Sequence, residues 1–449
     1  MLNPSDRRVP LPSAIHDRTA VLGFVGLGYV GLPVALSLAA TGFQVRGCDS
    51  NADRVAAIRA GRLPFARGEP GLLELLTSVG PNMFGVSEDP AILSDVDVIF
   101  VAIDTPLADG RRFDSARFLA GVRTATARLR AGSALIIEST IPPGTIDDVV
   151  IPELSARGFD VGTDVIVLHC PERLRPGRLL GNLRSMGRLI GGDSERSAAI
   201  GIALYRTIVH ASLQGVHYRT AEVCKTAENA TRDVQIALAN QIAVVCDAAD
   251  VDFREVRAAV NTLWQGEPIV LEAGPGVGGH CLPKDPWLMV AGVVDETARS
   301  LVAGARAMND FMPRHTVAIA SMMLARTARR LADSTVVVLG LAYNDDSDDD
   351  RNSPGRAIAE LLRATGADVR EHDPLIAQYN VPLDEAFRDA DLAILIDAHS
   401  AYRSLDFSRL SATMRTALFL DTRRAFDPQV MTSHGLTYRA LGVGERQRD

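Results

Sequence analysis

Residues 20–49 constrain the fold of this 449-residue chain more than any other stretch. A short apolar run over 20–25 leads directly into Gly26-Leu27-Gly28-Tyr29-Val30-Gly31, and a helix-like segment then extends to about residue 41. A second apolar run follows and ends at Asp49. This order of strand, glycine-rich turn, helix, strand and acid is the fingerprint of a dinucleotide-binding βαβ unit.

The residues of this unit have separate predicted roles. Gly26 makes the tight turn, Gly28 lets a pyrophosphate approach the backbone, and Gly31 allows close packing of helix and strand. The helix N-terminus favours the anionic phosphates. Asp49 would accept a hydrogen bond from a ribose 2′-OH and repel a 2′-phosphate, which predicts NAD rather than NADP as the cofactor.

Further apolar runs alternate with helical segments, as in an open parallel sheet. The runs at 96–102, 133–137 and 165–168 each end in a loop with hydroxyl or charged side chains, among them Thr105 and Thr140. Parallel sheets bind ligands at these strand ends, although a threonine there equally suits a helix N-cap. Short strands of a second, smaller parallel sheet are predicted at about 334–340, 367–371, 391–396 and 417–421.

The region between the two sheets is predicted to be helical, with long helical patterns at about 220–260 and 298–330. We therefore predict an α/β protein in which two Rossmann-like parallel-sheet domains are joined by a central helical region with a long helix. The predicted parts are a flexible tail (1–18), an NAD-binding domain (19–215), a central helical and catalytic-loop domain (216–330) and a C-terminal domain (331–449).

One face of the first long helix carries Lys225, Glu228, Asn229 and Arg232, at positions i, i+3, i+4 and i+7. A polar stripe of this kind is often simply a solvated face. Here the residues that follow are strongly apolar, which predicts a helix buried over most of its circumference. We therefore expect the polar stripe to face a ligand.

The segment 274–286 contains four glycines and three prolines around a single cysteine, Cys281. Such a segment suits neither a helix interior nor a central strand. Asp285, Lys284 and His280 lie close to Cys281 in sequence, a setting in which a thiolate nucleophile is plausible. The alternative is a small apolar residue in a tight turn.

Composition excludes several classes of protein. The net charge of −8, without a Lys/Arg cluster, argues against nucleic acid as a partner. Five scattered cysteines without a Cys-x-x-Cys pair predict reduced thiols and no zinc site, and the absence of a signal-like segment predicts a cytoplasmic protein. Residues 21–43 lack charge but hold five glycines, so we interpret them as a buried βα unit rather than a membrane span. The acidic run 345–350 fits no EF-hand loop, so no metal site is predicted.

Together these motifs resemble the UDP-glucose/GDP-mannose dehydrogenase family, whose members use NAD to oxidise C6 of a nucleotide-linked hexose to a uronic acid. The resemblance covers nearly the whole chain after residue 19. It makes 331–449 the expected nucleotide-sugar (UDP)-binding domain. The motifs that carry it, in order, are Gly26–Pro33, Asp49 with Arg54, Ser139-Thr140, Pro143–Thr145, Pro171–Arg173, Lys225–Arg232, Gly278–Cys281, Gly340–Tyr343 and Asp350–Pro354.

The resemblance implies a four-electron oxidation in which Cys281 attacks the aldehyde that forms first. The resulting thiohemiacetal would be oxidised by a second NAD to a thioester. Lys225 and Asn229 would stabilise the oxyanion, Thr140 and Asp285 would position water, and Glu172 would assist hydrolysis. NAD would contact Gly26, Gly28, Tyr29, Val30, Gly31, Asp49, Arg54, Thr105, Thr140 and Arg351. The nucleotide sugar would contact Arg173, Leu174, Lys225, Asn229, Arg232, Gly278, Tyr343 and Asn344.

Within the family, Arg232 and His280 resemble the members that oxidise UDP-N-acetylhexosamines, and Val277 and Pro286-Trp287 resemble the UDP-N-acetyl-D-mannosamine branch. UDP-N-acetyl-D-mannosamine is therefore the expected substrate, for surface-polysaccharide synthesis, with UDP-N-acetyl-D-glucosamine or another UDP-sugar as the alternative. The chain departs from the family pattern at Asn344, where lysine is usual, at Gln241, and at 263–266, where basic residues are usual.

Two other interpretations of the sequence stay open. A two-electron hydroxyacid dehydrogenase would not need Cys281 and would form one NADH per substrate. A non-catalytic nucleotide-sugar sensor would bind its ligand without turnover. Whatever the function, the long apolar helix predicts a homodimer or higher homo-oligomer.

Overall fold

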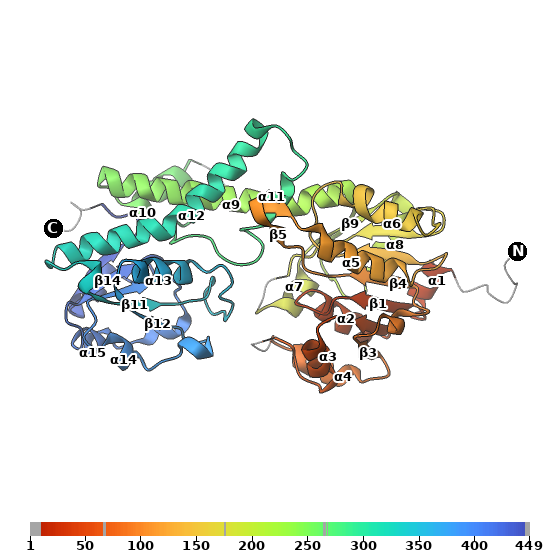
Figure 1. Ribbon diagram of the computed structural model, residues 1–449, viewed down its shortest axis with the longest axis horizontal. Coiled ribbons are helices and arrows are strands. Elements are labelled where there is room, and N and C mark those ends of the chain that lie inside the picture. The colour runs from red at the N-terminus through yellow and green to blue at the C-terminus, as the bar shows by residue number, and fades with distance from the viewer. Residues whose placement is uncertain (1–9, 66–68, 175–176, 264–265, 267, 445–449) are drawn as a thin grey trace, which may run out of the picture. The chain divides into compact units, whose positions relative to one another are not determined.

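The computed structural model describes residues 10–65, 69–174, 177–263, 266 and 268–444. The chain forms two compact units, and each is described by itself (Figure 1). Unit 1 comprises residues up to Glu228 together with Trp287–Gly292. Unit 2 comprises Asn229–Pro286 and the chain from Val293 onward.

Unit 1 is built on an eight-stranded sheet in the order β10-β9-β8-β7-β4-β1-β2-β3. The order β3-β2-β1-β4-β7-β8 is that of a doubly wound dinucleotide-binding sheet. All neighbouring strands are parallel except β8 and β9, which pair antiparallel, so the predicted Rossmann-like sheet is confirmed with one antiparallel pair added beyond β8. The strands are β1 Val21–Val25, β2 Gln44–Cys48, β3 Phe84–Ser87, β4 Val98–Val101, β7 Ala134–Ile137, β8 Ile166–His169, β9 Arg188–Gly192 and β10 Leu213–His217.

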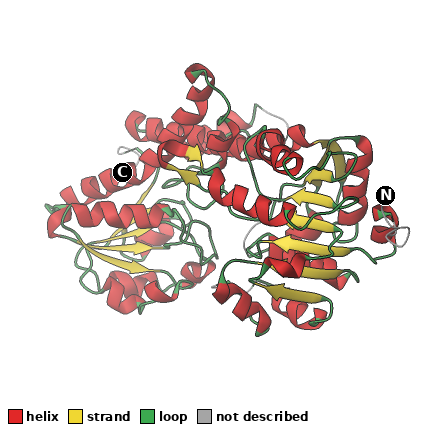
Figure 2. Cartoon of the chain, turned by 45° about the vertical axis from the view of Figure 1, so that its right-hand side comes forward, coloured by secondary structure: helices red, strands yellow, loops and turns green. Residues whose placement is uncertain are grey.

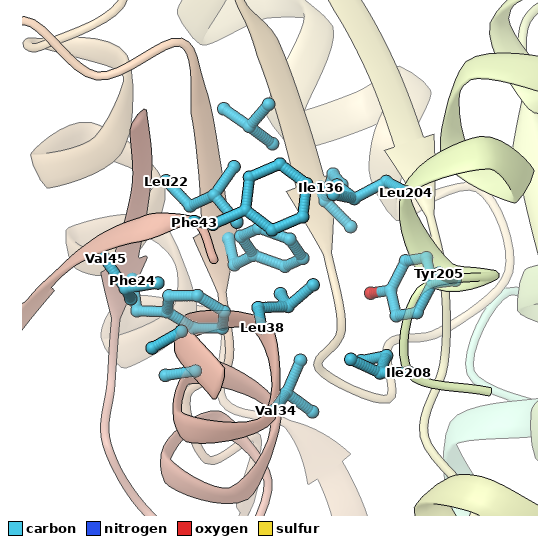
Figure 3. Close-up of a cluster of buried hydrophobic side chains, with 14 of the residues drawn as sticks. Leu22, Phe24, Val34, Leu38, Phe43, Val45, Ile136, Leu204, Tyr205 and Ile208 are labelled. Atoms are coloured by element: carbon cyan, nitrogen blue, oxygen red, sulfur yellow. The ribbon is translucent and has the colours of Figure 1, made fainter. Parts of the chain in front are cut away.

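Helices cover both faces of this sheet, as the layers in Figure 2 show. Because alternate residues of a strand point to opposite faces, Leu22 and Phe24 of β1 pack against Val34 and Leu38 of α2 (Figure 3). Ile99 of β4 belongs to the separate cluster on the other face. The helices of unit 1 are α1 Leu11–His16, α2 Gly31–Ala40, α3 Ala52–Arg59, α4 Leu72–Val79, α5 Ser115–Thr126, α6 Ile151–Ser155, α7 Leu179–Ser185 and α8 Glu195–Tyr205. A short hairpin joins β5 Leu107–Ala108 to β6 Arg112–Phe113.

The predicted flexible tail is wrong in its described part. Residues 11–16 form α1, in which Leu11, Ala14 and Ile15 are buried in the same core cluster as β1 and α2. Burial of these three apolar side chains explains why the segment is ordered although it is short. Residues 1–9 lie outside the described residues.

Unit 2 contains a five-stranded, all-parallel sheet in the order β12-β11-β13-β14-β15. The second parallel sheet is confirmed, with one strand more than predicted. In this flavodoxin-like order the ligand-binding crevice lies outside the carboxyl ends of β11 and β13. The strands are β11 Thr335–Leu339, β12 Asp368–His372, β13 Leu392–Leu395, β14 Leu418–Asp421 and β15 Thr437–Ala440.

The unit 2 sheet is also packed on both faces. Helices α12 and α13 cover one face through a cluster that includes Ile319 and Ile358, and α14 and α15 cover the other through Phe387 and Phe407. Ser353 caps α13 by accepting the N–H of Gly355, as its Ser-Pro sequence predicts. The helices that lie wholly in unit 2 are α10 Phe253–Asn261, α12 Glu296–Ala325, α13 Pro354–Ala364, α14 Leu383–Phe387, α15 Phe407–Ser411 and α16 Pro428–Ser433.

The long helix α9, Tyr218–Ala249, runs from unit 1 into unit 2. It is shorter than the predicted 220–260 because Asp250 adopts a left-handed φ of 61° and Asp252 then caps a separate helix, α10. Its predicted burial over most of the circumference is also wrong, since Val223, Leu238 and Val245 are 46%, 49% and 58% exposed. No helix among the described residues is long and apolar enough to cross a bilayer.

Candidate active site

The glycine-rich turn of unit 1 has the geometry that a dinucleotide phosphate requires. Gly26 has a φ of 95°, and its N–H donates to the carbonyl of Cys48 at 2.9 Å. A Cβ at Gly31 would lie 2.0 Å from the carbonyl oxygen of Gly26, so only glycine fits there. A Cβ at Gly28 would have no atom within 4 Å, which leaves open space where the phosphates are expected.

Asp49 stands at the carboxyl end of β2 and is held by three donors. Its carboxylate accepts the N–H of Leu27 at 2.7 Å, the N–H of Asn51 at 2.9 Å and the guanidinium of Arg54 at 2.8 Å. A pocket over α3 includes two of these donor residues but not Asp49 itself; it is lined by Asn51, Asp53, Arg54, Ala56, Ala57, Arg62 and Pro64. An oriented acid next to the glycine turn fits the adenosine ribose of NAD.

The loops after β4 and β7 are tied to each other. The hydroxyl of Thr105 donates to the carbonyl of Thr140 at 2.7 Å, and Ser139 accepts the N–H of Ile103 at 2.9 Å. No helix begins at either threonine, so the capping alternative is wrong for both. These two predicted NAD contacts therefore belong to one rigid edge of the sheet.

A glutamate that the sequence did not single out anchors the loop after Thr140. The carboxylate of Glu222 on α9 accepts the N–H of Gly144 at 2.7 Å and of Ile146 at 2.9 Å. Burial raises the pKa of Glu222 to about 7, although both backbone donors oppose that shift. The second turn of α9 thus fixes one of the predicted active-site loops.

The predicted substrate residues after β8 are bonded within unit 1. Arg173 forms an ion pair with Glu228 of α9, and its guanidinium donates to the carbonyl of Gly187 at 2.5 Å. The carboxylate of Glu172 accepts the N–H of Leu174. Glu228, predicted only as part of the polar stripe, is therefore the partner of a predicted sugar contact.

In unit 2 the segment 274–285, here called the nucleophile loop, is fastened at three places. At its start the N–H of Gly274 donates to Asn240 of α9 at 2.9 Å. In the middle the N–H of Gly279 donates to the carbonyl of Arg351 at 2.9 Å, and Asn352 donates back to the carbonyl of Gly279 at 3.0 Å. At its end Asp285 is bonded to Asn229, as described next. A loop fastened at both ends and its middle can hold a side chain in one place.

The acid at the end of the loop is buried between an amide and a cation. Asn229 on α9 donates to one oxygen of Asp285 at 2.6 Å, and the ammonium of Lys284 lies 3.1 Å from the other. The N–H of Asp285 donates to the carbonyl of Cys281 at 2.8 Å, so the acid and the half-buried thiol belong to one turn. This turn brings together three of the predicted catalytic residues, Asn229, Cys281 and Asp285.

The glycines before Cys281 allow Tyr343 to pack directly on the loop. A Cβ at Gly278 would lie 2.7 Å from the Cβ of Tyr343, and one at Gly279 would lie 2.8 Å from its ring. Tyr343 itself follows β11, at the ligand-binding edge of the unit 2 sheet. The nucleophile loop and the predicted nucleotide-sugar edge are thus in contact within unit 2.

The acidic run after Tyr343 is used for internal bonds. Asp345 accepts the N–H of Ala398 at 2.8 Å, Asp346 accepts the N–H of Ser400 at 2.8 Å, and Asp349 pairs with the guanidinium of Arg351. Among the residues that the structure describes, no three His, Cys, Asp or Glu side chains form a group that could hold a metal. The run therefore shapes the loop.

The remaining predicted residues lie apart from these contacts. Lys225, which belongs to unit 1, is buried on α9 one turn before Asn229, whereas Arg232 and Asn344 are exposed. Thr140 and Glu172 also belong to unit 1. The departure noted at 263–266 includes Trp264 and Gln265, which lie outside the described residues.

Arg423 is a further cation at the ligand edge of unit 2, and it was not predicted from the sequence. It follows β14, donates to the carbonyl of Ile396 at 2.7 Å and pairs with Asp397 at 2.8 Å. A Cβ at Gly274 would lie 2.7 Å from its guanidinium, which places Arg423 against the start of the nucleophile loop. The sequence did offer a signal for Arg423: it comes just after a buried strand, and the predicted site residues of the other strands also lie just after the strand ends.

Comparison with known families gives matches to three consecutive models of the UDP-glucose/GDP-mannose dehydrogenase family. The NAD binding domain matches residues 20–209, the central domain 219–311 and the UDP binding domain 337–428. These matches include every motif described above.

Individual relatives agree over almost the whole chain. The UDP-N-acetyl-D-mannosamine dehydrogenase of Pyrococcus horikoshii is 32% identical over 95% of this chain and 100% of its own length, and its solved structure superposes with a TM-score of 0.87. The NDP-N-acetyl-D-galactosaminuronic acid dehydrogenase of Ralstonia nicotianae is 32% identical over 91% of this chain and 97% of its own. A protein of the same description from Methanosarcina mazei, also 32% identical, gives a TM-score of 0.82 over 97% of this chain and 98% of its own.

Proposed function

Because this chain belongs to the UDP-glucose/GDP-mannose dehydrogenase family, and is thus an NAD-dependent nucleotide-sugar dehydrogenase, we propose that its substrate is UDP-N-acetyl-D-mannosamine. The reaction is a four-electron oxidation of C6 to UDP-N-acetyl-D-mannosaminuronate. The similarity to the UDP-N-acetyl-D-mannosamine dehydrogenases of Pyrococcus horikoshii and Methanococcus aeolicus, over 94–95% of the chain, carries the choice of sugar.

The mechanism depends on keeping the half-oxidised sugar bound. When bound in unit 1, NAD would supply the hydride acceptor. In the first oxidation C6 loses a hydride and its hydroxyl loses a proton, which leaves the C6 aldehyde. The Cys281 thiolate adds to the C6 aldehyde and forms a thiohemiacetal, whose C6 hydrogen leaves as the second hydride. The thioester that results is hydrolysed by water, which returns the thiolate and releases the carboxylate.

Other side chains act on the charges that develop in these steps. Lys225 and Asn229 stabilise the oxyanion of the thiohemiacetal. Asp285, held between Asn229 and Lys284, orients water for hydrolysis, with Thr140 as a second water contact and Glu172 as the base. The buried ion pair at Asp285 supports this role because it fixes the carboxylate in one orientation.

A substrate panel tests the choice of sugar. The protein is incubated with NAD and each of UDP-N-acetyl-D-mannosamine, UDP-N-acetyl-D-glucosamine, UDP-N-acetyl-D-galactosamine, UDP-glucose and GDP-mannose, and NADH formed per sugar is measured. We expect two NADH per UDP-N-acetyl-D-mannosamine. Activity confined to the glucosamine or galactosamine epimer would replace the proposed sugar, the latter in line with the galactosaminuronic acid relatives. A ratio of one NADH would instead indicate a two-electron dehydrogenase, and binding without turnover a sensor.

Introducing the missing cation should strengthen nucleotide-sugar binding. Asn344 is exposed at the ligand edge, after Tyr343, and bears no charge. A charge-assisted hydrogen bond to a diphosphate contributes roughly 1–3 kcal/mol, so we expect Asn344→Lys to lower KM for the UDP-sugar by about 5-fold or more with little change in kcat. Initial-rate kinetics measure this. Asn380→Lys, a neutral-to-cation change outside the predicted site, is the control, and an unchanged KM in Asn344→Lys would contradict the proposed diphosphate contact.

A homodimer is part of the proposal. Val223, Leu238 and Val245 are exposed along α9, and burial of this face against a second copy would remove apolar surface from water. A scattering mass of 48.1 kDa at working concentration would contradict it. A cytoplasmic location and a role in surface-polysaccharide synthesis stay predictions from the sequence.

A further inference from the structure

A chain of buried polar side chains connects α9 and α12 to the nucleophile loop, and none of its members is among the predicted catalytic residues. Asn240 accepts the N–H of Gly274 at 2.9 Å and donates to Asn309 at 2.9 Å. Asn309 donates to the carboxylate of Asp233 at 2.8 Å. Arg306 donates to the same carboxylate at 2.6 Å. All four side chains are at most 2% exposed, and all of them lie in unit 2. Helices α9 and α12 are labelled in Figure 1.

The direction of this chain follows from chemistry. Both partners of the Asn309 NH₂ only accept. One is the Asp233 oxygen that also receives the guanidinium of Arg306, and the other is the backbone carbonyl of Asp233, 3.1 Å away. Asn309 must therefore turn its NH₂ toward Asp233 and its oxygen toward Asn240. Asn240 in turn must present its NH₂ to Asn309 and its oxygen to the loop. That oxygen is the acceptor that the N–H of Gly274 needs in a buried site.

We propose that Asp233, Asn309 and Asn240 form an orientation relay that positions the start of the nucleophile loop by fixing which amide atom faces Gly274. The three are positioning residues, since they act through the backbone of the loop. The inference rests on the proposed function of Cys281 as the nucleophile. It adds that the hydrogen-bond acceptors of residue 233 contribute to the placement of that thiol.

Positioning matters here because the loop is fastened at few points. If Asn240 were free to turn its NH₂ toward Gly274, two donors would face each other and the start of the loop would move. A displacement of about 1 Å at a reacting group costs on the order of 100-fold in rate. The other two attachments, at Gly279 and Asp285, do not fix the start of the loop.

Removing the amides of the relay tests the direction argument. Asn309→Leu removes the oxygen that orients the Asn240 amide, and Asn240→Leu removes the acceptor of the Gly274 N–H. Leucine is close in volume to asparagine, and each variant should lower kcat at least about 10-fold while KM for NAD stays unchanged.

Asp233→Asn keeps the direction of the relay. The oxygen of the asparagine can still accept from Arg306 and Asn309, and the backbone carbonyl at position 233 still accepts from Asn309. Arg306 also keeps Asp310, 2.5 Å away, as its partner. We expect this variant to retain most of the kcat that the two leucine variants lose.

Two readouts do not depend on turnover and so separate this inference from the proposed function. Hydrogen exchange at the Gly274 amide and the rate and pH profile of Cys281 alkylation by iodoacetamide should change in both leucine variants and stay unchanged in Asp233→Asn. Thr316→Val, which removes a buried α12 hydroxyl that bonds to the carbonyl of Met312 in the same helix, is the control and should leave both unchanged. Leucine variants that behave like the unmodified protein, or an Asp233→Asn variant that loses as much as they do, would overturn the relay. If hydrogen exchange and alkylation respond as expected but Cys281→Ala keeps the four-electron rate, the result would count against the proposed function alone.

Discussion

Cys281→Ala is expected to abolish formation of the uronic acid, with a loss of about 10³-fold or more in the four-electron rate. Loss of a nucleophile that forms a covalent intermediate usually has an effect of this size or larger. The first oxidation needs no thiol, so aldehyde and at most one NADH per sugar should form. NADH yield and chromatography of the sugar products measure both results.

Two further variants separate the chemistry of Cys281 from its packing. Cys281→Ser keeps nearly the same volume and a hydroxyl in place of the thiol, but a hydroxyl is far less acidic and should fail in the same way. Cys246→Ala removes a buried thiol of α9 and is the control. The hydrophobic cluster that contains Cys246 includes no residue of the nucleophile loop, so this variant should retain the four-electron rate. Acid formation by Cys281→Ala at the rate of the unmodified protein would rule out the thioester mechanism.

Local signals in the sequence predicted the parts of the fold that depend on neighbouring residues. The turn around Gly26 and the cap at Ser353 are of this kind, because their geometry is decided within a few positions. The break after Ala249 could not be predicted in the same way. It depends on Asp250 adopting a positive φ, which non-glycine residues rarely do. Strand β15 was missed because Thr437–Ala440 is short and carries a charged residue, Arg439.

The candidate site shows the same division. The residue types at Cys281 and Asp285 could be recognised from the spacing of the nucleophile loop alone. The bond between Asn240 and Gly274 joins residues 34 positions apart, and the bond between Asn240 and Asn309 joins residues 69 apart. No periodicity in the sequence encodes such pairs, since they depend on how α9 and α12 pack. The acidic run shows the same limit, because its carboxylates bond to the loop itself and to backbone N–H groups 53 and 54 positions away, which its composition does not indicate.

Gly279→Ala is expected to reduce kcat about 100-fold by moving the nucleophile loop, because small displacements at a reacting group are this costly. Gly279 has a φ of 87°, where an L-residue is strained by roughly 1–2 kcal/mol. Its new Cβ would also lie 2.8 Å from the ring of Tyr343. Tyr343 cannot retreat without cost, because its N–H donates to the carbonyl of Asp349 at 3.0 Å. Steady-state kinetics and the rate of Cys281 alkylation measure the effect.

The strain and the clash can be told apart by a double variant. In G279A/Y343A the ring is absent, so the collision disappears while the strained φ remains. Alkylation of Cys281 should then recover only in part, and the recovered fraction measures the contribution of the ring contact. Gly292→Ala is the matched control, since a Cβ there meets no atom within 4 Å and its φ is not in the left-handed region. If Gly279→Ala kept full kcat and normal alkylation, the loop would not need its present backbone path, and the contact between Tyr343 and the loop would have no part in placing the thiol.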